Sequence, residues 1–163
     1  MLIYGQDVAL AKWAGDRLGI QDWGPARAIG VVRHGSLAAV AVFHHYRHPD
    51  IEISFVTAHK GWATPQVVRG ILRYPFIQLG CKRLTAITGA TNQPTSAFLC
   101  RLGFRQEGIH PDVFLTEDAI SYGLLRRDAA KWLKEKECSE NVAPGSAVSD
   151  VAYGASRDAK IAA

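Results

Sequence analysis

One stretch in the middle of the sequence constrains the fold more than any other. Apolar and polar side chains alternate over residues 50–57, which predicts a strand with one buried face. A helix is predicted over 64–79, because Thr64 is a good N-cap and Pro65 suits the first helical position. Residues 83–88 alternate again and predict a second strand. Strand, helix and strand in this order indicate a βαβ unit.

The residues after this unit predict a short helix and two more strands. The helix is expected over 93–102, and Leu102-Gly103-Phe104 closes it. Strands are expected over 105–110 and 119–125, with a turn at 116–118 between them. Pro75 lies inside the longer helix of the βαβ unit and should kink it, because proline has no N–H to donate.

The residues before the unit predict three strands and a helix. A short edge strand is expected over 2–4 and a helix over 6–18, ended by Gly19. Two longer strands, 26–33 and 37–46, are joined by a tight turn at His34-Gly35-Ser36. The second of them is apolar on both faces until its end, so we expect the sheet to be covered on both sides.

The C-terminal part of the chain changes in composition. A charged helix is expected over 126–137, anchored by Trp132 and Leu133. From Cys138 onwards, small and polar residues dominate, and such a segment buries too little surface to offset its ordering entropy. We therefore expect one domain over 1–136 and a disordered or loosely docked tail over 137–163.

Composition excludes several classes of protein. At 163 residues, with 48% hydrophobic and 21% charged residues, the chain is typical of a globular protein with a real core. No apolar run is long enough to span a bilayer, and the N-terminus does not resemble a signal peptide. Cys81, Cys100 and Cys138 are odd in number and lack metal spacing, which favours reduced thiols in the cytoplasm.

The net charge of +4 favours an anionic partner, such as a nucleotide cofactor, a nucleic acid or an acidic protein. Many ordinary enzymes are equally basic, however, so the charge alone does not choose among these partners.

Residues 92–108, from Asn92 through Leu102-Gly103-Phe104 to Glu107-Gly108, resemble a segment of the GNAT superfamily of N-acyltransferases. In that family an Asn after the fifth strand opens a helix that ends in Leu-Gly-Phe, and a strand with Glu-Gly follows. The resemblance extends over residues 27–126. It implies an α/β (α+β) fold: a mixed, mostly antiparallel central sheet with a central βαβ unit and helices on both faces.

The resemblance also implies transfer of an acetyl (acyl) group from acetyl-CoA to a primary amine by direct attack. In the family, two central strands splay apart and the pantetheine chain lies in the gap. The cofactor-binding residues carried over by position are Ile53, Ser54, Phe55, Lys60, Ala63, Thr64, Gln66, Val67, Asn92 and Phe98. The phosphate loop departs from the family pattern, with Lys60, Ala63 and Pro65 in place of its Gln/Arg and two glycines. Since Pro65 has no N–H, the cradle would use Thr64, Gln66 and Val67.

The family uses a carboxylate on the central strand as general base, and two carboxylates are candidates for that role here. Asp50 and Glu52 point to the same side of the strand, roughly 7 Å apart. Glu52 lies deeper among apolar neighbours, which suits a base. The alternatives are structural: an ion pair to Arg33 or Arg47 for Glu52, and a turn cap for Asp50.

His44 is a third catalytic candidate, as a proton shuttle near neutral pH. His44 and His45 are adjacent on a strand, so we expect them to face opposite sides. Two such side chains do not converge on one ion, and we therefore expect no metal site.

The acid for the leaving thiolate is missing from its usual place, because Leu99 stands where the family carries Tyr. Tyr122, Cys100 or water would substitute, or the thiolate leaves unassisted. For Cys100 we favour a buried structural thiol over a nucleophile, since no paired histidine is evident.

Two other functions stay open. The same fold could act on a nucleobase amine of DNA or RNA, or it could be a non-catalytic module that binds CoA or a partner. The acceptor is not identified by the sequence, a homodimer is not excluded, and no membrane partner is expected. Trp13 and Trp23 would line an acceptor pocket or, as we favour, only pack.

Overall fold

The protein is described by a computed structural model, which covers residues 1–134. Within these residues, seven strands form one sheet in the order β1-β2-β3-β4-β5-β7-β6. In chain order the elements are β1 (Leu2–Ile3), α1 (Asp7–Leu18), β2 (Arg27–Arg33), β3 (Ser36–Arg47), β4 (Asp50–Thr57), α2 (Pro65–Arg73), the π-helical turn η1 (Tyr74–Gln78), β5 (Arg83–Gly89), α3 (Gln93–Leu102), β6 (Arg105–His110), β7 (Ala119–Leu125) and α4 (Ala130–Leu133).

The sheet is mixed and mostly antiparallel, as predicted. Every neighbouring pair is antiparallel except β4 and β5, which are parallel and are connected through α2. The predicted βαβ unit is therefore confirmed, and it lies at the centre of the sheet.

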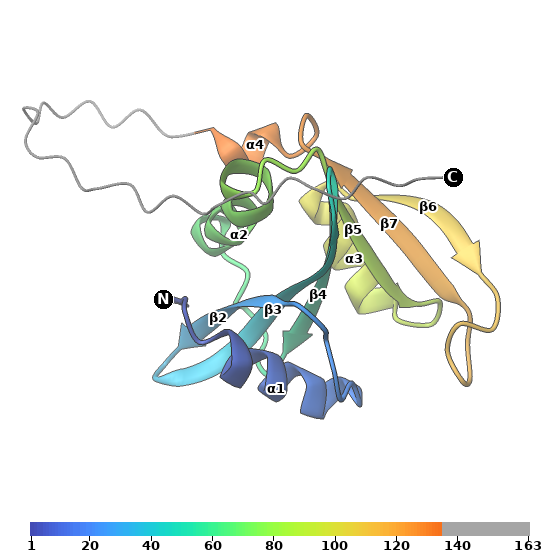
Figure 1. Cartoon of the computed structure of the whole chain (residues 1–163), viewed down its shortest axis with the longest axis horizontal. Helices are drawn as coiled ribbons and strands as arrows, with labels where there is room; N and C mark the ends of the chain where they lie inside the picture. Colours follow the sequence, from blue (N-terminus) through green and yellow to red (C-terminus); the bar gives the residue numbers. More distant parts are fainter. Residues whose placement is uncertain (135–163) are drawn as a thin grey trace, which may run out of the picture.

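Helices cover both faces of the sheet, which confirms the prediction that the sheet is covered on both sides (Figure 1). The helix α1 packs on one face, where Leu10 and Ala14 join Val40 and Val42 in a small core. The helices α2 and α3 pack on the other face and form the larger core with the opposite side of the same strands. Strand β3 is buried on both faces over residues 38–44 because it lies between these two layers.

The helix ends follow the local signals in the sequence. The Thr64 side chain accepts a hydrogen bond from the Val67 N–H at 3.4 Å, and Pro65 is the first helical residue. Gly19 and Gly103 end α1 and α3 with φ of 72° and 108°, in the left-handed region that glycine tolerates best.

Pro75 interrupts the helix that was predicted over 64–79. The α-helical part ends at Arg73, and residues 74–78 form a π-helical turn. Proline supplies no N–H to the helical ladder, and the wider turn accommodates this, with the Leu79 N–H donating to the Tyr74 carbonyl at 3.0 Å.

The predicted helix over 126–137 is too long for the residues that the structure describes. Residues 126–129 form a turn, and α4 spans only Ala130–Leu133. Trp132 anchors it as expected, because its indole N–H donates to the Leu102 carbonyl at 2.7 Å. The predicted tail over 137–163 and Cys138 lie outside the described residues, so the division into domain and tail stays a prediction.

None of the described helices is both long and apolar enough to cross a membrane.

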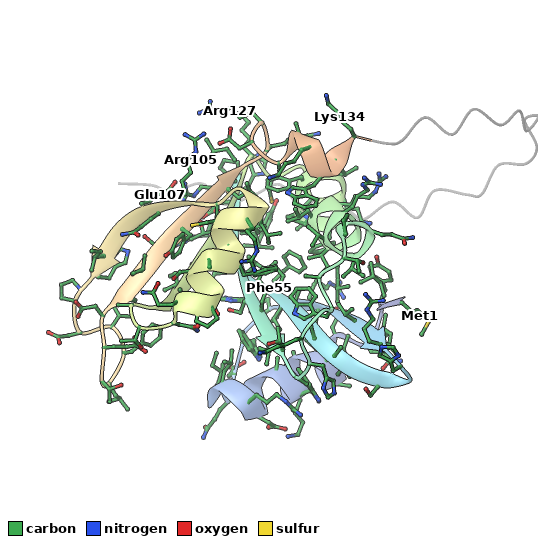
Figure 2. All side chains as sticks on the ribbon, turned by 180° about the vertical axis from the view of Figure 1, so that it is seen from behind. Met1, Phe55, Arg105, Glu107, Arg127 and Lys134 are labelled. Carbon is green, nitrogen blue, oxygen red and sulfur yellow. The ribbon has the colours of Figure 1, made fainter. Side chains whose placement is uncertain are left out.

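An ion pair bridges the outer strands across β7. The two terminal guanidinium nitrogens of Arg83 on β5 donate to the carboxylate of Glu107 on β6, with the Nη1–Oε1 bond at 2.9 Å. Gly123 of β7 lies beneath the pair, where a side chain would collide with both partners. Glu107 is labelled in Figure 2. Hydrogen bonds from Arg83 hold the pKa of Glu107 below its usual value.

The larger core should dominate stability. Leu72 of α2 is fully buried, so Leu72→Ala should lower the free energy of unfolding by about 2–5 kcal/mol through lost burial and a residual cavity. Ile77 lies in the adjacent turn and is 43% exposed, so Ile77→Ala should change the free energy of unfolding by less than about 0.5 kcal/mol. Urea denaturation measures both, and equal losses would contradict this location of the core.

The Arg83–Glu107 pair predicts a pH dependence of stability. Because the folded-state pKa of Glu107 is lowered, its stabilisation is present above the ordinary glutamate pKa of about 4.3 and is lost as pH falls through the lower folded value. Both side chains are partly exposed to solvent, so Glu107→Gln should cost less than about 1 kcal/mol at pH 7. Urea midpoints of the two proteins should converge as the pH falls below the ordinary glutamate pKa of about 4.3, whereas a constant difference would contradict the ionic origin.

Candidate functional site

A cleft opens where the two central strands separate. Strands β4 and β5 pair only from Asp50–Arg83 to Glu52–Thr85. Beyond this point β4 continues to Thr57 and β5 to Gly89, and the strands fan apart (Figure 1). The space between them is a cleft of about 450 Å³. The gap that the resemblance implied is therefore present.

Both strands, α3 and two connecting segments line this cleft. Its walls are Ile53, Ser54 and Phe55 of β4, residues 86–89 of β5, and Thr95 and Leu99 of α3 with the preceding Asn92. The rim is formed by Leu18 and Ile20 at the end of α1 and by Val113, Phe114 and Glu117 of the β6–β7 connection.

The predicted cofactor residues divide into two groups. Ile53, Ser54, Phe55 and Asn92 line the cleft. Asn92 is also the N-cap of α3, because its side chain accepts a hydrogen bond from the Thr95 N–H at 3.3 Å. The others, Lys60, Ala63, Thr64, Gln66, Val67 and Phe98, do not line it.

Ser54 connects the cleft to a histidine behind the strand. Its hydroxyl oxygen lies 2.9 Å from His44 Nε2. His44 is only 9% exposed, and burial together with the neighbouring His45 lowers the pKa of His44, an effect that Glu52 opposes. The neutral imidazole is therefore favoured next to the cleft.

The prediction that His44 and His45 face opposite sides is wrong. Their Nδ1 atoms are 3.2 Å apart, and His45 Nδ1 lies 3.1 Å from Glu52 Oε2. The cause is an irregularity in β3: its register with β4 shifts between His44 and Arg47, and His45 has a φ of 48°. A bulge of this kind breaks the strict alternation of side chains, so the ground for expecting no metal site here is also removed.

The two carboxylates of β4 share Arg47, which lies 4.0 Å from Asp50 Oδ2, but their closer partners differ. Glu52 forms an ion pair with Arg47, whose Nη2 lies 3.2 Å from Glu52 Oε1. An ion pair with Arg47 is one of the structural roles expected for Glu52. Asp50 is not a turn cap. It accepts a hydrogen bond from the Thr85 hydroxyl at 2.9 Å, and Arg83 Nε lies 3.7 Å from it. Asp50 therefore joins the start of β4 to Thr85, the last residue of β5 that is paired with β4.

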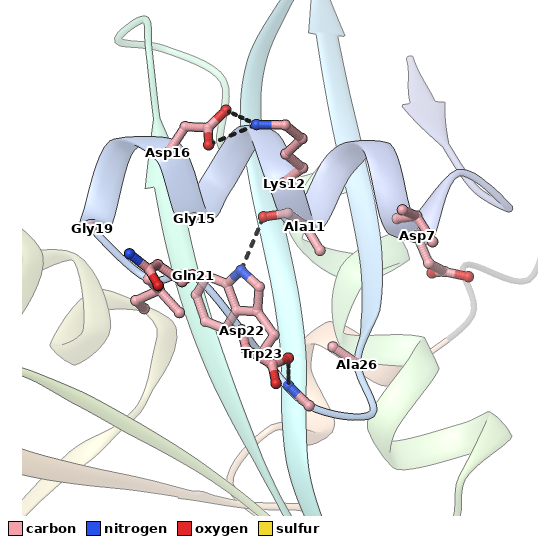
Figure 3. Close-up of a pocket in the computed structure, with 13 residues that line it drawn as sticks. Asp7, Ala11, Lys12, Gly15, Asp16, Gly19, Gln21, Asp22, Trp23 and Ala26 are labelled. Atoms are coloured by element: carbon pink, nitrogen blue, oxygen red, sulfur yellow. Dashed lines mark hydrogen bonds and ion pairs between the residues drawn. The ribbon is translucent and has the colours of Figure 1, made fainter.

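Trp23 covers His44 from the side of α1. The two rings are 5.0 Å apart, and the indole N–H donates to the Ala11 carbonyl of α1 at 2.9 Å (Figure 3). Trp23 also lines a shallow pocket of about 610 Å³ outside α1, and neither it nor Trp13 lines the cleft between the strands. Both therefore pack rather than form the cleft.

The loop before α2 forms a separate, basic pocket. Arg33, His34, His59 and Lys60 line this space of about 380 Å³. The expected N–H cradle is partly used already: the Thr64 N–H donates to the Trp62 carbonyl at 3.0 Å, and the Val67 N–H donates to the Thr64 hydroxyl at 3.4 Å. Of the three donors expected there, Gln66 is the one not engaged by Trp62 or Thr64.

An aromatic cluster fills the space between β4, the loop and α3. Trp62 packs against Phe55 and Phe98 with ring centroids 5.7 and 5.4 Å away, and it is buried. Figure 2 labels Phe55 beside α3. Phe55 belongs both to this cluster and to the cleft wall, whereas Trp62 and Pro65 are not part of that wall. The cleft itself is therefore not plugged by either residue.

Neither of the side chains predicted to protonate the leaving thiolate, Tyr122 and Cys100, lines the cleft. Leu99 occupies the family's Tyr position and lines the cleft as a buried apolar residue. Tyr122 is buried in the larger core. Cys100 is exposed, so the prediction of a buried thiol is wrong for it, and Cys81 is the buried one of the two cysteines within residues 1–134.

The rim residues are the part of the site that the sequence did not indicate. Glu117 accepts hydrogen bonds from the Thr91 N–H and hydroxyl, both at 2.7 Å, and these lower the pKa of Glu117. This contact holds the β6–β7 connection against the start of α3. A long-range contact between two loops has no signature in the local sequence.

Comparison with known proteins supports the fold. No protein-family model matches the sequence, and no curated protein matches it. Among solved structures, a mutant of the spermidine N-acetyltransferase SpeG from Vibrio cholerae has a TM-score of 0.64 and 14% identity, covering 82% of this chain and 97% of its own.

Two further structures agree. A probable acetyltransferase has a TM-score of 0.58 and 21% identity, over 76% of this chain and 72% of its own. A GCN5-related N-acetyltransferase from Brucella melitensis has a TM-score of 0.57 and 20% identity, over 65% of this chain and 53% of its own. The chain thus has the fold of the GNAT acetyltransferases.

Proposed function

We propose that this protein transfers an acetyl group from acetyl-CoA to a primary amine. The observation that supports this most strongly is the cleft between β4 and β5, which begins directly after the three residue pairs that join these strands. A long, thin thioester fits between two separating strands whose unpaired backbone groups can hydrogen-bond to its amides. We infer that the reaction takes place in the cytoplasm, because the odd number of cysteines without metal spacing favours reduced thiols there.

The nucleotide end of the cofactor would bind near the basic pocket. Lys60 and Arg33 supply positive charge, and the first N–H groups of α2, with Gln66 among them, supply donors at a positive helix end. The pantetheine arm would then run along Ile53, Ser54 and Phe55 towards Asn92.

The proton of the attacking amine would leave through Ser54. Its hydroxyl can pass a proton to His44 Nε2, 2.9 Å away. Glu52 Oε2 lies 3.9 Å from His44 Nδ1 and would stabilise the resulting imidazolium. In this arrangement Glu52 positions and stabilises the base rather than touching the substrate.

The amine nitrogen would attack the thioester carbon, and collapse of the tetrahedral intermediate would break the C–S bond. The thiolate would take its proton from water, since a thiol with a pKa of about 8.5 is a good leaving group and no predicted side-chain acid lines the cleft. The apolar rim formed by Leu18, Ile20, Val113 and Phe114 suits an acceptor that carries its amine on an apolar body.

A non-catalytic CoA-binding module is the second candidate, favoured by Leu99 at the position of the missing acid and by the buried Trp62 beside the loop. Calorimetry with acetyl-CoA and desulfo-CoA, followed by release of free thiol in the presence of a panel of primary amines, separates the two. Binding without thiol release would favour the module, and no binding would exclude both.

Removal of the Ser54 hydroxyl should impair turnover selectively. We expect Ser54→Ala to lower kcat about tenfold or more with little change in the KM for acetyl-CoA, because the proton route to His44 is broken. Ser121→Ala on β7 is the matched control, since its hydroxyl contacts His110 outside the cleft. Equal rates for Ser54→Ala and the wild type would exclude this route.

Lys60→Ala should weaken the binding of acetyl-CoA up to about fivefold, because one exposed charge contact is worth at most about 1 kcal/mol. Binding of acetyl-pantetheine, which lacks the nucleotide, should not change. Lys131→Ala on α4 controls for loss of a surface charge. If Lys60→Ala weakened both thioesters equally, or neither, the nucleotide would not lie over this pocket.

A further inference from the structure

Three potential metal ligands meet behind the cleft. His44 Nδ1 and His45 Nδ1 are 3.2 Å apart, and Glu52 Oε2 lies 3.1 Å from His45 Nδ1 and 3.9 Å from His44 Nδ1. In the described part of the chain, no other group of three histidine, cysteine or carboxylate ligands is this close together.

The spacing fits a transition metal. A point equidistant from these three atoms lies about 2.0 Å from each, which is the length of a zinc–nitrogen or zinc–carboxylate bond. Three protein ligands leave a fourth position open. Magnesium and calcium prefer all-oxygen ligands, so the two imidazoles favour zinc, or cobalt as its spectroscopic substitute.

The backbone is bent to bring these ligands together. His45 has a φ of 48°, which is uncommon for a residue other than glycine, and the register of β3 and β4 shifts beside it. In a regular strand the two imidazoles would lie on opposite faces. The bulge instead places both next to Glu52.

The two less exposed ligands, His44 and Glu52, each have a partner on their other side, as metal ligands do. His44 Nε2 lies 2.9 Å from the Ser54 hydroxyl, and Glu52 Oε1 is held by Arg47 at 3.2 Å. The His45 side chain is 65% exposed, so an ion can reach the site from solvent.

We propose that His44, His45 and Glu52 form a binding site for a divalent transition metal, with zinc as the best-fitting ion. Metal on Nδ1 of His44 leaves the ring proton on Nε2, which then donates to Ser54 instead of accepting from it. The metal would therefore block the proton route and inhibit acetyl transfer. This consequence rests on the proposed function, whereas the metal site itself does not.

Cobalt binding to the full chain tests the site without any activity assay. After treatment with a chelator, titration with Co²⁺ should give the strong visible absorption of a tetrahedral ion at one equivalent, and Zn²⁺ should displace it. His45→Asn should weaken binding at least about tenfold, because an imidazole ligand is lost while Asn tolerates the positive φ. Glu52→Gln is a second variant with the same expected loss.

His110→Asn is the matched control. This histidine is also exposed and on a strand, but its ring nitrogen hydrogen-bonds to Ser121 and it belongs to no group of three potential ligands in the described structure, so the variant should bind cobalt like the wild type. An absent or octahedral cobalt spectrum, or equal binding by His45→Asn and the wild type, would overturn the site.

Activity then tests the consequence separately. Zn²⁺ should inhibit thiol release by the wild type, a chelator should restore it, and residual activity of His45→Asn should be at least about tenfold less sensitive. Cobalt binding by a chain with no transferase activity would support the metal site and contradict the proposed function. Transferase activity without cobalt binding would support the proposed function and contradict the metal site.

Discussion

The two halves of this sheet are held together by three residue pairs between β4 and β5. The Asp50 carboxylate reinforces this short junction, because it accepts from the Thr85 hydroxyl of the neighbouring strand and lies close to Arg83. Arg83 in turn binds Glu107 on β6, so one chain of polar contacts runs across the sheet at its short paired segment. Beyond that segment the strands have no partner on their facing edges, and the cleft follows.

The same junction explains why polar groups collect behind the cleft. Side chains of β4 that do not face α2 and α3 point towards α1, and at the end of β3 the bulge adds two imidazoles to that side. Trp23 shields His44 from solvent, while His45 stays exposed. A buried and a solvent-facing histidine therefore share one carboxylate, and Ser54 connects them to the cleft. Proton transfer at Nε2 and metal binding at Nδ1 would compete for the same imidazole, that of His44.

Local signals predicted most of the fold. The alternation over 50–57, the Thr64-Pro65 start and the left-handed Gly103 each depend on residues close in sequence, and each is found as predicted. The bulge at His45 was missed because it depends on cross-strand register, which alternation cannot show. The rim was missed for the same reason, since Glu117 meets Thr91 only once β7 has paired with β5. The cleft residues on β4 were found through family resemblance, and the partners of Asp50 and Glu52 required the structure.

The central claim is that the thioester lies between β4 and β5, and amide hydrogen exchange with and without acetyl-CoA tests it most directly. Backbone amides of β4 beyond Glu52, where the partner strand has departed, should become protected when acetyl-CoA binds. Amides of β6, at the far edge of the sheet, should not change. Protection confined to other parts of the chain, with β4 exchanging as before, would contradict the claim.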